Sequence, residues 1–189
     1  MNSNSIVFLA KNISGNRAFF GTGSVLDEGR DENGNKYILT AKHLLFSNNN
    51  KENEEFFIYD NKRNFIGKAI TFLSPDIKSK NVKDFLKNDI LLLKISENSE
   101  SFKKIKGLKI SEKRSGNLLS MENMQGKIGF NPGLSGSPVL NSNGEIIGVA
   151  CGFINKFSLL HSSYVNVTGE DMFKNLKTTL VFLLLKLYL

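Results

Sequence analysis

Short β-prone runs separated by turn residues occupy most of this 189-residue chain. Valine, isoleucine, threonine and aromatic residues, which suit the pleated surface of a sheet, are concentrated in these runs. The dipeptides Asn33-Gly34 and Asn143-Gly144 fall between runs and favour the positive φ values of tight hairpin turns. The pattern predicts an all-β sandwich or barrel, with strands near 6–10, 18–26, 37–40, 56–59, 65–73, 90–95, 139–140, 145–151 and 159–167.

One glycine-rich turn presents a candidate nucleophile. The segment 130–140, FNPGLSGSPVL, places Ser135 between Gly133 and Gly136, where backbone N–H groups can converge on an oxyanion. Glycine tolerates unusual φ values, and Pro132 restricts the entry to the turn. A serine hydroxyl attacks a carbonyl at neutral pH only if a base takes its proton, so a plain turn serine is the alternative interpretation.

A candidate base and a candidate orienting carboxylate occur earlier in the chain. His43 follows a strand-like run in 36–45, KYILTAKHLL, and an imidazole can accept and return a proton near neutral pH. Asp89 opens the apolar run of 88–95, NDILLLKI, whereas Asp76 and Asp84 have no such strand after them. The competing interpretations are a surface or capping histidine and an aspartate that keeps a strand end polar.

Four blocks carry a family resemblance: GTGSVL (21–26), LTAKH (39–43), NDILLLKI (88–95) and GLSGSP (133–138), in this order. Together they resemble the trypsin-like, chymotrypsin-fold serine peptidases, in a style similar to HtrA-like bacterial and viral protease domains. The resemblance covers roughly residues 5–175. It implies two six-stranded antiparallel β-barrels followed by a C-terminal α-helix.

The resemblance also implies a division of the chain. Residues 1–98 would form the first barrel with His43 and Asp89, residues 99–168 the second barrel with Ser135, and residues 169–189 a helix and apolar tail. The polar stretch 96–101 is the expected connector between the barrels. The active site would then lie in the cleft between the two barrels.

The implied chemistry is peptide hydrolysis through a Ser-His-Asp triad. His43 would act as general base and then general acid, Asp89 would fix its tautomer, and Ser135 would form the acyl-enzyme. The N–H groups of Gly133 and Ser135 would form the oxyanion hole. No metal or cofactor is expected.

The resemblance places the substrate pocket on three segments without charged side chains. This favours a small or medium apolar substrate residue and argues against lysine or arginine; the strand near 150–152 is expected to pair with the substrate backbone. His161 is interpreted as an ordinary strand-end residue, with substrate selection as the alternative. The expected lining residues are Gly129, Phe130, Asn131, Pro132, Ala150, Cys151, Gly152, Ser162, Ser163 and Tyr164.

Two departures from the family pattern bear on activity. Leu134 stands where secreted digestive members carry an aspartate that pairs with a new N-terminal amine, so activation by N-terminal cleavage is not expected. Ser137 replaces a commoner glycine. The predicted function is a serine endopeptidase acting on a specific protein substrate; the alternative is a silent or partner-activated module that holds an extended peptide in the cleft.

Composition indicates the class of protein, its partners and its location. A 40% apolar and 23% charged chain is in the globular range, and the net charge of +7 includes a basic cluster at 103–114. That cluster lacks interleaved aromatic residues, so a solvated face is expected and specific nucleic-acid binding is not. Cys151 is the single cysteine, which excludes an intramolecular disulfide; because the N-terminus also lacks a signal-like pattern, a cytoplasmic location is predicted.

The C-terminal part changes pattern after residue 167. Thr168 and Asp171 resemble a helix start, and apolar residues then follow helical spacing. The last 12 residues, 178–189, are almost entirely apolar but fall short of the ~20 needed to span a bilayer. We expect this tail to pack on the enzyme, a partner, a second copy or a membrane surface.

Overall fold

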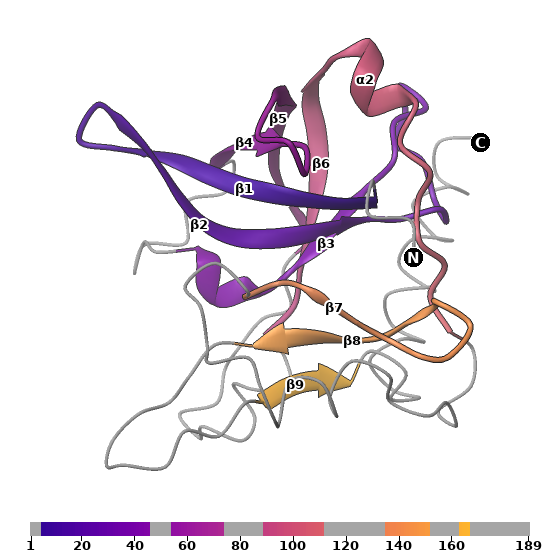
Figure 1. Cartoon of the computed structure of the whole chain (residues 1–189). Helices are drawn as coiled ribbons and strands as arrows, with labels where there is room; N and C mark the ends of the chain where they lie inside the picture. The colour runs from indigo at the N-terminus through magenta and orange to yellow at the C-terminus, as the bar shows by residue number, and fades with distance from the viewer. Residues whose placement is uncertain (1–4, 46–53, 74–88, 112–134, 152–162, 167–189) are drawn as a thin grey trace, which may run out of the picture.

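The computed structural model describes residues 5–45, 54–73, 89–111, 135–151 and 163–166. These residues form a closed antiparallel barrel and a separate three-stranded sheet beside it (Figure 1). The barrel order is β1-β2-β3-β6-β5-β4. Its strands are β1 (Ile6–Ile13), β2 (Asn16–Val25), β3 (Ile38–Thr40), β4 (Glu55–Tyr59), β5 (Phe65–Leu73) and β6 (Leu91–Asn98).

The barrel forms because alternate residues of its strands turn apolar side chains inward. Along β1, Val7 and Leu9 are buried in the core, while the neighbouring residues Phe8 and Ala10 belong to a smaller cluster with Phe57 and Tyr59. Because the barrel is closed, each of its strands is hydrogen-bonded to a neighbouring strand on both sides. The short helix α2 (Glu100–Lys103) follows β6 and contributes Phe102 to the core.

Three connections share one hydrogen-bonded turn design. In each, a carboxylate or amide oxygen of the first residue accepts the backbone N–H groups two and four positions later. The fourth residue of each turn has positive φ. It is a glycine in the two Asn-Gly turns, as the sequence predicts, and an arginine in the turn that begins at Asp60. The turns begin at Asp31, Asp60 and Asn141, and their positive-φ residues are Gly34, Arg63 and Gly144.

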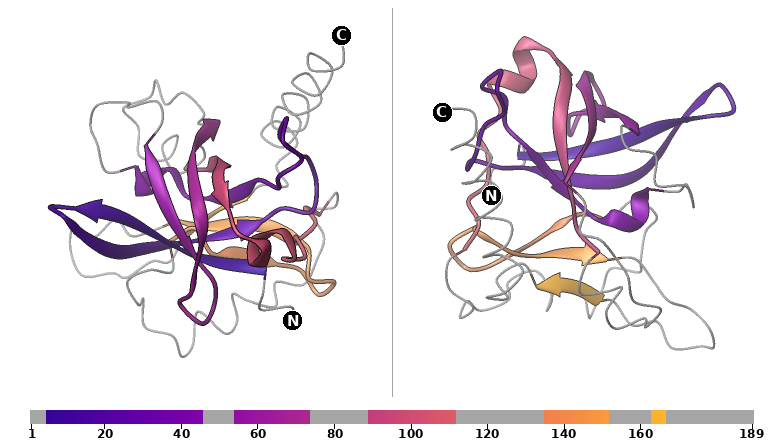
Figure 2. Two further views of the ribbon diagram at one scale, coloured as in Figure 1. Left: turned by 90° about the horizontal axis from the view of Figure 1, so that it is seen from above. Right: turned by 180° about the vertical axis from the view of Figure 1, so that it is seen from behind.

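The second sheet has the order β7-β8-β9, with β7 (Pro138–Leu140), β8 (Ile146–Cys151) and β9 (Ser163–Asn166). It lies next to the barrel in both views of Figure 2. The chain between α2 and residue 111 joins the two parts through isolated parallel bridges, Leu26 to Leu108 and Ile110 to Ile146. Ile146 and Val149 extend the barrel's hydrophobic core into this sheet.

The predicted all-β architecture is confirmed for a closed six-stranded barrel; a second barrel is not established by the described residues. One boundary prediction is wrong. The stretch 96–101 is not a connector, because β6 runs to Asn98 and pairs with β5 beyond a register shift, and Ser99 caps α2. The predicted C-terminal helix and tail, 169–189, lie outside the described residues.

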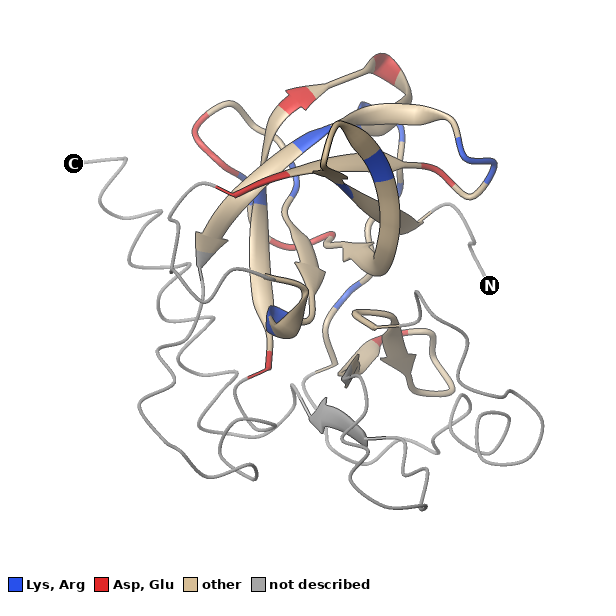
Figure 3. Ribbon diagram, turned by 90° about the vertical axis from the view of Figure 1, so that its left-hand side faces the viewer, with Lys and Arg blue, Asp and Glu red and all other residues tan. Residues whose placement is uncertain are grey.

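Charged residues are dispersed over the described surface. Acidic and basic positions are interspersed over the ribbon in Figure 3, without a single-sign face in that view. In the predicted basic cluster, Lys103, Lys104, Lys106 and Lys109 are exposed and alternate with buried apolar residues, as expected for a solvated face. Within the described part of the chain, no helix is long and apolar enough to cross a membrane.

Candidate active site

His43 sits on a three-residue 3-10 turn, η2 (Lys42–Leu44), directly after β3. Ala41 precedes the turn in extended conformation and provides no side-chain cap. The turn's own backbone bonds are few: Leu45 N–H donates to Lys42 O at 2.9 Å and Leu44 N–H to Ala41 O at 3.4 Å. The position of His43 therefore depends on contacts from other elements.

Asp89 supplies two of these contacts. Its Oδ1 accepts the backbone N–H of His43 at 2.7 Å, and its Oδ2 lies 2.7 Å from His43 Nδ1. The Asp89 side chain is 2% exposed and that of His43 is 25% exposed. The buried Asp89 carboxylate thus hydrogen-bonds to both the backbone and the ring of His43, which solvent or a ligand can still reach.

This arrangement selects one histidine tautomer. A carboxylate oxygen only accepts hydrogen bonds, so Nδ1 is the ring nitrogen that donates to Asp89. Nε2 is then the nitrogen that can accept a proton from a hydroxyl group. Charge-assisted bonds of this kind are each worth about 1.5–3 kcal/mol, enough to hold the ring in one orientation.

Ser135 lies on a half-buried turn that leads into β7. Its carbonyl accepts the backbone N–H of Thr22 in β2 at 2.8 Å. The following residues pair with β8: Gly136 N–H donates to Ala150 O, and Ala150 N–H donates to Ser137 O, both at 2.8 Å. Backbone bonds therefore tie the serine turn to the barrel on one side and to the second sheet on the other.

Gly136 has no room for a side chain. Its φ is +87°, and a Cβ there would lie 2.0 Å from the Thr22 carbonyl oxygen and 2.2 Å from Thr40 Oγ1. Thr40 Oγ1 donates to that same carbonyl oxygen at 2.6 Å, and Thr40 is fully buried. The serine turn thus packs directly against the end of β3, three residues before His43.

Three segments far apart in sequence consequently meet at one edge of the barrel. The turn 135–137 contacts β2 and the end of β3, β3 leads into the His43 turn, and Asp89 holds His43 from the start of β6. The structure thus joins His43 to Asp89 directly and seats Ser135 on the same edge.

The predicted substrate-binding positions are described only in part. Ala150 and Cys151 lie on β8, and their backbones pair with Tyr164 and Ser163 of β9. These two predicted pocket segments are therefore neighbouring strands. The remaining predictions, on Gly129, Phe130, Asn131, Pro132, Gly133, Leu134, Gly152, His161 and Ser162, lie outside the described residues.

Sequence reasoning missed three contributors to this edge. Thr22 and Thr40 fix the serine turn, but a threonine in a strand is too common to single out. Lys11 donates from Nζ to the carbonyl of Leu44, the residue after His43, at 2.8 Å. Its signal in the sequence is a charge in the inward phase of Val7 and Leu9.

Metal ligation has no support in the described part of the chain. No group of three or more histidine, cysteine, aspartate or glutamate residues gathers there in a form that would hold a metal ion.

Comparison with known proteins places this geometry in a fold. No family model matches the chain, and no curated protein matches it in sequence. Solved structures do: a Glu endopeptidase shares 14% identity with a TM-score of 0.58, over 95% of this chain and 91% of that one. A serine endoprotease from Yersinia pestis shares 15% identity with a TM-score of 0.54, over 95% of this chain and 64% of that one.

Both neighbours are chymotrypsin-fold serine proteases, so the resemblance inferred from the four sequence blocks holds at the level of the fold.

Proposed function

We propose that this chain is a serine endopeptidase in which Ser135 is the nucleophile, His43 the general base and Asp89 the orienting carboxylate. The observation that carries the proposal is the double contact of buried Asp89 with His43, at 2.7 Å to both its N–H and its ring. The seating of the serine turn on the same barrel edge and the protease-like fold support it.

The residues fit the steps of acyl transfer. Nε2 of His43 would take the Ser135 hydroxyl proton as Oγ adds to the substrate carbonyl carbon. The imidazolium, stabilised by Asp89, would then give that proton to the leaving amine as the C–N bond breaks. A water molecule activated by His43 would release the acyl group and restore the serine.

The finer assignments extend this proposal. The N–H groups of Gly133 and Ser135 would stabilise the oxyanion, and β7–β9 would belong to a second barrel within 99–168. The β8 residues 150–152 would pair with an extended substrate, and the uncharged pocket positions favour a small or medium apolar residue before the cut. We also propose a cytoplasmic location, activity without a metal ion, and a docking role for residues 178–189.

Hydrolysis of a peptide library tests the function. The library spans apolar, acidic and basic residues at the cleavage position, because one structural neighbour is named for glutamate. We expect wild-type turnover, with at least a thousandfold loss in Ser135→Ala (about 10³–10⁶ for loss of a nucleophile). Ser137→Ala, two residues along the same turn, is the matched control and should retain turnover.

The outcome also separates the alternative function. A catalytically silent module would bind library peptides without cleaving them, with or without cell extract. Turnover that appears only with extract, and that still requires Ser135, would indicate activation by a partner.

A further inference from the structure

A charged side chain lies inside the barrel, where the strand pattern calls for an apolar one. Lys11 follows Val7 and Leu9 in the inward phase of β1, and the residue is 5% exposed. Burying an ammonium group is costly unless acceptors surround it. The contacts of Lys11 therefore indicate what the burial achieves.

Among the described residues, Lys11 Nζ contacts a carbonyl oxygen, a carboxylate and aromatic rings. It donates to Leu44 O at 2.8 Å, lies 2.5 Å from Glu54 Oε1, and stands 4.7 Å from the centre of the Phe56 ring and 5.3 Å from that of Phe20. Burial lowers the pKa of Lys11, while the hydrogen bond and charge of Glu54 act in the opposite direction. The ammonium is thus held in place by one carboxylate and two ring faces.

The carbonyl that Lys11 binds belongs to the turn that carries His43. That turn has two internal backbone bonds, one of them at 3.4 Å, and no side-chain cap at its start. Asp89 restrains the His43 N–H and ring on one side. Lys11 restrains the carbonyl of Leu44, so hydrogen bonds from other elements hold the turn at both His43 and Leu44.

We propose that Lys11, supported by Glu54, is a positioning residue that fixes the His43 turn from inside the barrel, an inference that rests on the proposed function. Lys11 acts through the Leu44 carbonyl, and its loss lets the turn and the imidazole shift relative to Ser135. Displacement of a catalytic group by about 1 Å can cost on the order of 100-fold in rate.

A purely structural role of Lys11 predicts that kcat recovers together with stability when Lys11 and Glu54 are both replaced by apolar residues. Replacing both members of a buried ion pair by apolar residues is often neutral or stabilising, and the Lys11 and Glu54 side chains are 7% and 22% exposed, so we expect the fold to tolerate loss of both charges. An apolar side chain in the phase of Val7 and Leu9 fills the barrel equally well. It cannot donate a hydrogen bond to the Leu44 carbonyl.

The test compares Lys11→Met with the double variant Lys11→Met/Glu54→Leu in the full chain. The single variant leaves Glu54 without its lysine, so a lower melting temperature is expected; the double variant should recover much of it. We expect kcat to stay at least about tenfold below wild type in both variants, with KM changed less than about twofold. If the single variant does not fold, the kcat of the double variant alone still tests the proposal.

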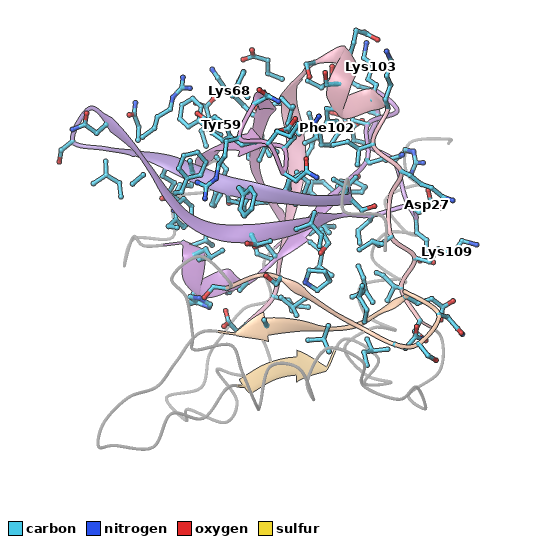
Figure 4. All side chains as sticks on the ribbon, viewed as in Figure 1. Asp27, Tyr59, Lys68, Phe102, Lys103 and Lys109 are labelled. Carbon is cyan, nitrogen blue, oxygen red and sulfur yellow. The ribbon has the colours of Figure 1, made fainter. Side chains whose placement is uncertain are left out.

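Lys68→Met is the matched control. Lys68 also pairs with glutamates, at 3.2 Å from Glu97 and 3.8 Å from Glu55, but it lies on β5, on the side of the barrel away from β7–β9 (Figure 4). Its kcat should equal that of wild type. Recovery of wild-type kcat together with stability in the double variant would show a structural role and overturn the proposal.

A second readout does not depend on turnover. The proton between His43 Nδ1 and Asp89 Oδ2, which lie 2.7 Å apart, should give a strongly deshielded NMR signal. We expect this signal to shift or broaden in both Lys11 variants and to stay unchanged in Lys68→Met. An unchanged signal in the Lys11 variants contradicts the positioning role. If the wild type hydrolyses no peptide, the proposed function fails, whereas this signal still decides whether Lys11 holds His43.

Discussion

At the scale of single residues, the proposed mechanism depends most on the Asp89–His43 pair. Each carboxylate oxygen takes one of the two His43 contacts, so the carboxylate restrains position and tautomer together. The neutral amide of asparagine has one accepting oxygen and an NH₂ group that only donates. A substitution that keeps the size of Asp89 therefore separates its charge and acceptor capacity from its volume.

Asp89→Asn should lower kcat by about 10³–10⁴, because the amide favours the wrong tautomer of His43 and no longer stabilises the imidazolium. Steady-state kinetics at saturating substrate measure this loss. Asp60→Asn is the control, since Asn141 performs the Asp60 role in an equivalent turn. Retention of wild-type kcat by Asp89→Asn would remove this carboxylate from the mechanism.

Tyr37 gives a pH-dependent prediction. It stacks on Phe72 at 4.9 Å between ring centres, and burial, followed by the charges of Asp31 and Glu32, raises the pKa of Tyr37 to about 12. The unfolded chain ionises this phenol near its ordinary value of 10.0, so the contribution to stability is complete below about pH 10 and is lost as the pH rises towards 12.

Denaturant titrations of wild type and Tyr37→Phe at pH 7, 10 and 11 measure this effect. The wild type should lose more unfolding free energy between pH 7 and 11 than the phenylalanine variant does. Equal losses in the two proteins would mean that the phenol ionises alike in the folded and unfolded chains.

At the scale of elements, most strand limits could be predicted from the sequence. The sequence predicted β5 at its observed limits and the other barrel strands to within a few residues, because apolar alternation and turn residues are both local signals. It missed the end of β6, where the polar residues Glu97 and Asn98 pair with β5. Pairing across a sheet depends on a distant strand, so local polarity is a poor guide to the end of a strand.

The serine turn yields the element-scale prediction. Gly136→Ala would put a Cβ 2.0 Å from the Thr22 carbonyl, in addition to the strain of positive φ, and should separate the turn from the barrel. We expect a loss of at least about 2–3 kcal/mol in stability or a large drop in kcat. Thermal melting and steady-state kinetics report the two effects.

Gly144→Ala is the control for this variant. Gly144 also has positive φ, +76°, but a Cβ there would have no atom within 4 Å. Only the backbone strain, about 1 kcal/mol, should appear, and kcat should be preserved. Equal effects at residues 136 and 144 would mean that the close packing of the serine turn on the barrel has no energetic role.

At the scale of the whole molecule, the barrel and the second sheet both bind the serine turn through backbone hydrogen bonds. Sequence motifs singled out His43, Asp89 and Ser135 as candidates because each lies in a recognisable local context, and their catalytic roles stay predictions. Lys11 and the Thr22–Thr40 contact could not be found in this way, since their importance depends on closure of the barrel and on packing between its parts. The specificity pocket stays a prediction, because its predicted residues lie largely outside the described segments.

Covalent labelling of the full chain with a fluorophosphonate, followed by mapping of the modified residue by mass spectrometry, tests the nucleophile assignment most directly. We expect one phosphonyl group per wild-type molecule, on Ser135, and no labelling of Ser135→Ala. Equal labelling of the two proteins, or modification of another serine at the same rate, would contradict the assignment of Ser135 as the nucleophile.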